Sequence, residues 1–314
     1  MKIAVLGAGA MGSLFGGRFA EGGHEVTLIS TRAGHVDRIN REGLRLDGLG
    51  GDRLVRVRAC LSAAEAGPAE LVIVSVKATQ TREAMAGALG LVGPETLVLT
   101  LQNGLGNVES LAEAVGPERV IAGTSSHGAN LKGPGRVCHA GGGATALGEL
   151  SGLITDRLRS LGRVFEASGF APVTLSDNVL SLIWKKLVIN VAINAITALA
   201  RIRNGQIFDF PETGEISRLA VLEAVEVARR KGITFPDDPL EFTRAVALET
   251  GANRSSMLQD VIRRRRTEIE VINGAIVREG EALGVPVPVN KVLAGLVSAC
   301  QRTYPKTGGA AAPQ

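Results

Sequence analysis

The chain has 314 residues, of which 45% are hydrophobic and 21% charged, as is typical of a soluble protein with two domains of roughly 150 residues each. No cationic leader precedes the apolar start at Ile3, and no uninterrupted apolar run has the ~18 residues of a spanning helix, so we expect a cytoplasmic protein without membrane contacts. Three widely spaced cysteines without CxxC spacing argue against a disulfide framework or a zinc site, and we expect no metal.

The formal charge of +4 and the run RRRR at residues 263–266 raise the alternative of nucleic-acid binding. The run lies in a helical pattern, Glu268 and Glu270 follow it, and no aromatic residues are interleaved. We therefore favour a solvated helix and expect no nucleic-acid partner. Basic charge also suits a phosphorylated cofactor or an anionic substrate.

Residues 1–175 alternate β-rich runs with stretches of helical periodicity. The runs are IAVL, EVTLIS, LVIVSV, TLVLTL and RVIAGTS. This alternation predicts βαβ units, and therefore an α/β domain with a doubly wound parallel sheet. Residues 44–60 predict a small antiparallel excursion with a glycine-rich turn, and the short strands of residues 133–150 are expected at the far edge of the sheet.

Strand patterns stop near Asp177, and the later segments up to Tyr304 have helical periodicity. We therefore predict a Rossmann-type domain over residues 1–175 and an all-α domain over residues 176–305. Residues 306–314 lack an apolar face and are predicted to be disordered. The apolar surface of the last helices suits either a homodimer or packing within the chain.

The segment VLGAGAMG places three glycines directly after the first strand and at the start of a helix, which is the G-x-G-x-x-G context of a dinucleotide site. Gly7 permits a tight turn, Gly9 lets the backbone approach a pyrophosphate, and Gly12 allows close packing of helix on strand. The helix N-terminus then offers unpaired amides to the phosphates. The predicted cofactor-binding residues of this loop are Gly7, Ala8, Gly9, Ala10, Met11 and Gly12.

The second strand ends on Ser30, Thr31 and Arg32, where a site that prefers NAD usually has an acidic residue. A carboxylate would repel a 2′-phosphate, whereas a guanidinium binds it with two hydrogen bonds. The sequence therefore predicts NADP(H), with Arg32 on the phosphate. Lys77 follows another strand of the same sheet and either adds charge at this site or is a solvated loop lysine.

Residues 180–200 are apolar nearly all round, yet Lys186, Asn190, Asn194 and Thr197 recur on one helical face. Polar groups are costly to bury without partners, so we expect this stripe to face a polar cavity. The alternative is an internal hydrogen-bond network that joins helices. Lys185 has apolar neighbours one and two turns on, and its ammonium should extend outward.

A second stripe, Ser256, Asp260, Arg264 and Glu268, has spacings of four residues and would line one side of a single helix. Exposed ion pairing is the ordinary alternative. Asn103 follows the strand TLVLTL, at the edge of the sheet where the nicotinamide should bind.

A lysine between a hydride donor and a set of amides suits carbonyl reduction, because an ammonium stabilises the developing oxyanion and then donates a proton. His127 is a rival acid that we interpret as a wall residue of the site.

Several motifs together resemble the ketopantoate reductase (2-dehydropantoate 2-reductase) family, within the broad 6-phosphogluconate dehydrogenase-like group. They are GAGAMGS, SVKATQT, QNGLGN, GTSSHGA, WKKLVINVAINAITAL and SSMLQDVIRRRRTEIEVINGAIV, and the similarity runs from Met1 to about Tyr304. The resemblance implies NADPH-dependent reduction of 2-dehydropantoate to (R)-pantoate on the route to pantothenate and coenzyme A. It also implies that the substrate lies between the two domains.

The resemblance implies roles for individual residues as well. Lys186 matches the family's catalytic lysine, and Glu268 matches a carboxylate near the nicotinamide. The implied substrate ligands are Asn103, Asn190, Asn194, Asn204 and Ser256, with Asp260 in support. Asn103, Lys77 and the backbone of Ala129 match cofactor contacts. The alternatives are a paralogue that reduces another branched 2-keto acid, an opine-type dehydrogenase, and a dinucleotide-binding module without catalysis.

Overall fold

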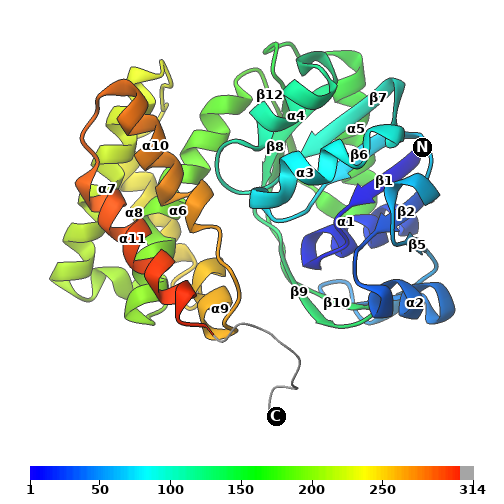
Figure 1. Ribbon diagram of the computed structural model, residues 1–314, viewed down its shortest axis with the longest axis horizontal. Coiled ribbons are helices and arrows are strands. Elements are labelled where there is room, and N and C mark those ends of the chain that lie inside the picture. Colours follow the sequence, from blue (N-terminus) through cyan, green and yellow to red (C-terminus); the bar gives the residue numbers. More distant parts are fainter. Residues whose placement is uncertain (305–314) are drawn as a thin grey trace. The chain divides into compact units, whose positions relative to one another are not determined.

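The computed structural model describes residues 1–304, so the predicted disorder of residues 306–314 lies outside the described part of the chain. The chain divides into two compact units, one over Met1–Ile183 and one from Trp184 onward (Figure 1). This division falls inside one continuous helix, α6 (Val179–Ala200). The predicted domain boundary between residues 175 and 176 stays a prediction.

The first unit is built on an eight-stranded sheet with the strand order β12-β11-β8-β7-β6-β1-β2-β5. Neighbouring strands from β8 to β5 are parallel, whereas β11 runs antiparallel to β8. The predicted doubly wound sheet is thus confirmed. The strands are β1 (Lys2–Leu6), β2 (Glu25–Ile29), β5 (Arg58–Cys60), β6 (Ala69–Val74), β7 (Val92–Thr100), β8 (Val120–Ser125), β11 (Thr145–Glu149) and β12 (Val173–Ser176).

Helices cover both faces of this sheet because successive side chains of a strand point to opposite faces. In β1, Ile3 and Val5 belong to one core with Phe15 of α1 and Phe165 of α5. Its alternate residues, Ala4 and Leu6, belong to a second core that includes side chains of α3 and α4. The helices are α1 (Ala10–Glu21), α2 (Ala33–Glu42), α3 (Thr81–Ala86), α4 (Asn107–Val115) and α5 (Asp156–Phe165).

A second sheet of four strands has the order β4-β3-β10-β9. The predicted antiparallel excursion is present as β3 (Leu44–Gly48) and β4 (Arg53–Val55), which pair antiparallel. The placement of residues 133–150 at the far edge of the main sheet is wrong in part. Only β11 of that stretch joins the main sheet, because β10 (Arg136–Gly141) pairs with β3 and with β9 (Gly128–Gly133).

The residues of the second unit that the structure describes, 184–304, form helices and turns without a strand, as predicted (Figure 1). A chain of hydrogen bonds joins four of its helices. Asn273 donates to the carbonyl of Val191 on α6 and to Asn290, and Asn290 donates to Glu223 on α7. The helices beyond α6 are α7 (Pro211–Arg230), α8 (Pro239–Glu249), α9 (Ser256–Ile262), α10 (Asn273–Leu283) and α11 (Pro288–Arg302).

The single helix predicted over residues 256–268 is wrong. α9 ends at Ile262, and Arg264 has a left-handed backbone with φ of +51°. Glu268 then precedes a short 3₁₀ turn, η7 (Ile269–Val271). Ser256 and Asp260 share one helix, but Arg264 and Glu268 belong to the connection after it, and the four arginines are exposed on that connection.

By length and composition alone, α6 is apolar enough to span a membrane, the only helix of residues 1–304 that meets this criterion. About 61% of its most apolar window is buried inside the protein. Burial of this kind is typical of a core helix, because the apolar surface is already covered by other helices.

Candidate functional site

The glycine-rich loop leaves no room for a side chain at Gly7 or at Gly12. Gly7 has φ of +103°, and a Cβ there would lie 2.6 Å from the backbone nitrogen of Val76. A Cβ on Gly12 would lie 2.1 Å from the carbonyl oxygen of Gly7. The loop is tied to the neighbouring strand, since the amides of Gly7 and Ala8 both donate to the carbonyl of Ile29, at 3.0 and 2.9 Å.

Gly9 differs from the other two glycines because no atom lies within 4 Å of where its Cβ would be. It is the N-cap of α1, and the first turn of that helix, which begins with Ala10, Met11 and Gly12, has no acidic residue. An open backbone at a helix N-terminus without nearby carboxylates fits a pyrophosphate. The loop therefore fits the phosphates of a dinucleotide, as the sequence predicts.

A buried histidine that sequence reasoning did not use supports this loop. The amide of Gly135 donates to Nδ1 of His35 at 3.0 Å, so the ring hydrogen is on Nε2, which lies 3.2 Å from Oγ of Ser13. Ser13 in turn donates to the carbonyl of Ala8. Burial and the charge of Arg32 lower the pKa of His35, which keeps the ring neutral. Its partners are distant in sequence, so no local pattern could reveal them.

Arg32 is the N-cap of α2, three residues beyond the end of β2, and its side chain is exposed. Its backbone amide donates to Oγ of Ser30 at 3.3 Å. The first turn of α2 has no acidic residue, and the space beside the α-carbon of Gly34 is open. Arg32 is thus free of a competing carboxylate in its own turn, which suits an anion at this helix end.

The loops after β6 and β7 are joined by side-chain hydrogen bonds. Gln102 donates to the carbonyl of Val76 and to Oγ1 of Thr81, at 2.8 and 2.9 Å. Asn107, which is buried and not predicted, accepts from Thr81 and donates to the carbonyl of Asn103. These bonds fix the backbone of Asn103 at the carboxyl edge of the sheet.

Lys77 lies on the same edge as Asn103. It is exposed and is the N-cap of the 3₁₀ turn that follows β6. β6 and β7 are parallel neighbours, so the residues that follow them reach the same edge of the sheet.

His127 lies between β8 and β9, two residues before Ala129. Its Nδ1 is 3.1 Å from Nε2 of His139, and its ring packs edge-on against Phe170 with centroids 5.1 Å apart. Burial, followed by the nearby His139, lowers the pKa of His127. A ring that is neutral at pH 7 is a poor proton donor, so His127 is a weaker candidate acid than Lys186. Ala129 is partly buried on β9, which pairs with β10.

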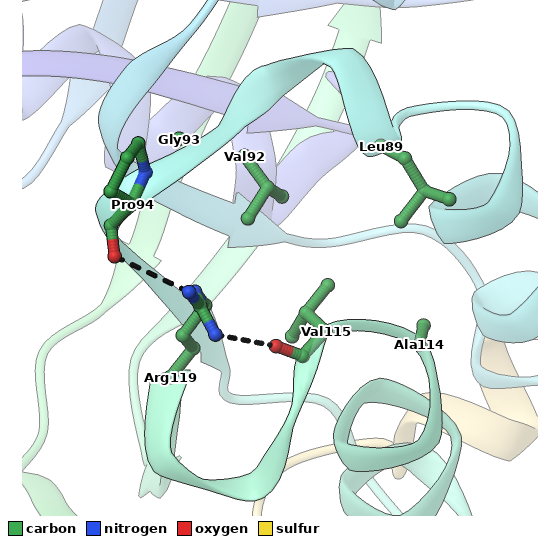
Figure 2. A pocket seen from close by; sticks show the side chains of 7 residues that line it. All are labelled: Leu89, Val92, Gly93, Pro94, Ala114, Val115 and Arg119. Atoms are coloured by element: carbon green, nitrogen blue, oxygen red, sulfur yellow. Dashed lines mark hydrogen bonds between the residues drawn. The ribbon is translucent and has the colours of Figure 1, made fainter.

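A surface hollow of about 480 Å³ lies elsewhere on this unit (Figure 2). It is at the start of β7, the amino edge of the parallel strands, whereas cofactors bind at the carboxyl edge. Arg119 spans it by donating to the carbonyls of Pro94 and Val115. The hollow is therefore separate from the glycine-rich loop.

In the second unit, the pKa of Lys186 is strongly lowered by its surroundings. Burial lowers the pKa of this lysine to about 8, and the negative charge of Glu268 partly opposes the shift. An amine with this pKa is mostly protonated at neutral pH and gives up its proton more readily than an ordinary lysine. Lys186 and Glu268 therefore act on each other electrostatically, as expected for a proton donor and its neighbouring carboxylate.

Lys185 has a different environment. Its ammonium lies 2.6 Å from the carboxylate of Asp237 and 4.7 Å from the ring centroid of Phe242. An ion pair and an aromatic face account for the charge of this side chain. The two adjacent lysines thus have different surroundings, and only Lys185 has its charge paired with Asp237 at the surface.

The polar stripe on α6 includes two carboxamides with unused donors. Nδ2 of Asn190 and Nδ2 of Asn194 are buried and have no hydrogen-bond partner among residues 1–304. Thr197, on the same face, donates to the carbonyl of Ile193 at 2.8 Å and lies 2.7 Å from Oγ of Ser255. The internal-network alternative thus holds for Thr197, whereas the two asparagines keep donors that a bound molecule can use.

Ser255 is buried and was not predicted. It is the N-cap of α9, where its Oγ accepts from the amide of Leu258 at 3.1 Å. Serine ahead of an apolar helical run is a recognised start signal, so this residue could have been found from the sequence. Ser256 is the first residue of α9 and is exposed, and Asp260 lies one turn further on, partly buried.

Asn204 is buried just before the 3₁₀ turn η6 (Gly205–Phe208), with 8% of its surface exposed. Its Nδ2 donates to Oγ1 of Thr250 at 3.0 Å, whereas its Oδ1 is buried without a partner in the described chain. Asn190, Asn194 and Asn204 therefore offer two unused donors and one unused acceptor. Among residues 1–304, no three His, Cys, Asp or Glu side chains form a group that could hold a metal ion.

Two family models match the chain. The model described as ketopantoate reductase PanE/ApbA matches residues 3–152, and the one described as its C terminal matches residues 178–301. Two similar curated relatives are the 2-dehydropantoate 2-reductases of Halobacterium salinarum and Archaeoglobus fulgidus. They are 39% and 38% identical to this chain, over 96% and 94% of it and over 99% and 96% of their own lengths.

Solved structures resemble the fold closely. A PanE/ApbA family ketopantoate reductase from Ralstonia eutropha is 36% identical, with a TM-score of 0.90 over 97% of this chain and 99% of that one. A D-mandelate dehydrogenase with NADH and anilino(oxo)acetate is 29% identical, with a TM-score of 0.90 over 97% and 99%. Both likenesses extend over the sheet unit and the helical unit.

Proposed function

Because the chain belongs to the ketopantoate reductase family, we propose that it reduces 2-dehydropantoate to pantoate with Lys186 as the proton donor. The reaction is that of its curated relatives, it uses a nicotinamide dinucleotide, and it serves pantothenate and coenzyme A biosynthesis. The observation that carries the role of Lys186 is its pKa of about 8, which the charge of Glu268 influences. Two asparagines with unused donors follow Lys186 on the same face of α6.

The bound nicotinamide supplies the hydride, and the residues of this chain do the rest. Gly7, Gly9 and Gly12 hold the pyrophosphate at the N-terminus of α1, while Asn103, Lys77 and the backbone of Ala129 contact the cofactor. As the carbonyl carbon gains the hydride, negative charge develops on its oxygen. The Lys186 ammonium stabilises that charge and then transfers one proton to it, leaving a neutral amine.

The other residues of the second unit position the substrate. Asn190 and Asn194 donate to oxygen atoms of the keto acid, and Asn204 and Ser256 bind its remaining polar groups. Glu268 keeps Lys186 protonated by its charge, and Asp260 supports the site from α9. Asn103 is a proposed contact of both substrate and cofactor.

NADP(H) is the proposed form of the cofactor, because Arg32 is exposed at a helix N-terminus without an acidic neighbour in that turn. Arg32→Ala should raise the KM for NADPH at least about tenfold and leave the KM for NADH nearly unchanged, since one charge-assisted contact is lost. An unchanged KM for NADPH would assign the 2′-phosphate to another group, such as Lys77.

A cytoplasmic location is part of the same proposal. The three free cysteines, Cys60, Cys138 and Cys300, suit a reducing compartment.

The D-mandelate dehydrogenase structures favour one alternative, reduction of an aryl 2-keto acid with NADH. A panel of 2-keto acids, assayed with NADPH and with NADH by loss of absorbance, separates the two. We expect the highest kcat/KM for 2-dehydropantoate with NADPH. A kcat/KM for 2-dehydropantoate no better than the panel average would contradict the proposal.

A further inference from the structure

The orientation of the Asn204 carboxamide is set by its neighbour Thr250. Thr250 is the C-cap of α8, and its hydroxyl hydrogen is used on the carbonyl of Val246, with the two oxygens 2.7 Å apart. A hydroxyl group has one hydrogen to donate, so Oγ1 of Thr250 can only accept from Asn204. The carboxamide must therefore turn its NH₂ to Thr250 and its Oδ1 the other way.

The backbone around these two residues is held in place. The amide of Asn204 donates to the carbonyl of Asn253 at 3.0 Å, and the amide of Gly205 donates to the carbonyl of Gly251 at 3.2 Å. The two segments touch, since a Cβ on Gly205 would lie 2.9 Å from the α-carbon of Gly251. A carboxamide on so constrained a turn keeps one orientation, which is what discrimination between substrates needs.

The unused polar atoms of Asn190, Asn194 and Asn204 differ in kind. Asn190 and Asn194 each have a buried donor without a partner in the described chain, whereas Asn204 has a buried acceptor. Donors suit the carboxylate and the carbonyl oxygen, which every 2-keto acid has. An acceptor requires a donor from the ligand, and a hydroxyl group on the carbon chain of a keto acid provides one.

From these contacts we infer that Thr250 is a specificity-determining residue: by fixing Asn204 with Oδ1 turned away from Thr250, it selects 2-keto acids that carry a hydroxyl group. The inference rests on the proposed function, because it concerns the substrate of that site. Selection for a hydroxyl group also distinguishes this chain from a reductase of aryl keto acids that lack one. A site built to bond a hydroxyl discriminates strongly against the analogue without one, since its polar group is then left unpaired.

The test compares two substrates that differ only in this hydroxyl, 2-dehydropantoate and 3,3-dimethyl-2-oxobutanoate. We expect wild-type kcat/KM to favour the hydroxylated acid by about a hundredfold or more. Thr250→Val removes the acceptor but keeps the shape of the side chain, so Asn204 can rotate. This variant should reduce the ratio of the two kcat/KM values at least about tenfold.

Two further variants keep the test specific. Thr250→Ser retains the hydroxyl and should restore the wild-type ratio. Thr303→Val is the matched control, because Thr303 is also a helix C-cap whose hydroxyl donates to its own helix, at Cys300. Thermal unfolding checks that each variant folds, and if Thr250→Val does not, Thr250→Ala makes the same comparison.

Other outcomes would overturn the inference. A wild-type ratio near one, or a Thr250→Val variant that loses activity equally on both acids, shows that Asn204 does not select for the hydroxyl. Wild type that reduces the deoxy acid and aryl keto acids but not 2-dehydropantoate contradicts the proposed function itself. The two failures are therefore distinguishable in one set of assays.

Discussion

At the scale of single residues, Lys185 and Lys186 show how position on a helix decides chemistry. Lys186→Ala should lower kcat by about 10²–10⁴, the usual contribution of a positioned acid, while the Kd for NADPH stays nearly constant. Lys185→Ala is the matched control, because this lysine is paired with Asp237 and lies on Phe242. It should change kcat by less than about threefold. Steady-state kinetics with a fluorescence titration of NADPH measures both, and near-normal turnover of Lys186→Ala would refute its role.

The pH dependence of reduction should report the pKa of Lys186. The acid must be protonated, so kcat/KM should fall as pH rises through about 8. The charge of Glu268 raises this pKa, and Glu268→Gln removes that charge. The alkaline limb of the profile should therefore move to lower pH.

The control for this shift is the carboxylate two residues on. Glu270→Gln removes a charge that is exposed and paired with Arg266, and it should leave the alkaline limb in place. If both variants shift the limb equally, the effect is one of net charge. If neither does, Lys186 is not the group that titrates.

At the scale of elements, substitutions in the glycine-rich loop distinguish an effect on cofactor binding from an effect on folding. Gly9→Ala should fold normally, because its Cβ meets no atom within 4 Å, and should weaken NADPH binding at least about tenfold by occupying the phosphate space. Gly12→Ala should instead lower the free energy of unfolding by about 1–3 kcal/mol, since its Cβ would overlap the carbonyl of Gly7. Thermal unfolding and NADPH titration of both variants test this. Equal loss of stability in both would contradict the assignment.

The elements that could be predicted from sequence are those with a local signal. Alternating runs and the glycine-rich loop identify the βαβ units because periodicity and turn residues act within a few positions. The pairing of β3 with β10 has no such signal, because β10 lies about ninety residues later in the chain. The end of α9 was missed because Arg264 adopts a left-handed backbone without the glycine that usually marks one.

The candidate site was predictable to a similar degree. The stripe on α6 follows from helical spacing, so Lys186, Asn190 and Asn194 could be found from one segment. Thr250 and Asn107 obtain their roles from partners in other segments, which a local sequence pattern does not reveal. Asn204 was reached only through the family resemblance, for the same reason.

At the scale of the whole molecule, the helical unit is stabilised by a chain of hydrogen bonds within that unit. In the helical unit, Glu223 on α7 accepts from the amides of Val289 and Asn290, at 2.8 and 2.9 Å, and so caps the N-terminus of α11. Asn290 continues to Asn273, which holds the carbonyl of Val191 on α6. Loss of Glu223 leaves these donors unpaired, and Glu223→Ala should lower the free energy of unfolding by about 2 kcal/mol.

The stabilisation of the native state by NADPH should be independent of the Glu223 cap on α11. NADPH at about one hundred times its Kd stabilises the native state by about 2.7 kcal/mol, which raises the Tm of a unit of this size by roughly 5–10 °C. Glu223→Ala should start from a lower Tm and show the same rise, because its partners all belong to the helical unit. Gly9→Ala should start near the wild-type Tm and show little rise at the same NADPH concentration. Differential scanning of the three proteins with and without NADPH measures this, and a rise abolished by Glu223→Ala would mean that the capped helices contribute to cofactor binding.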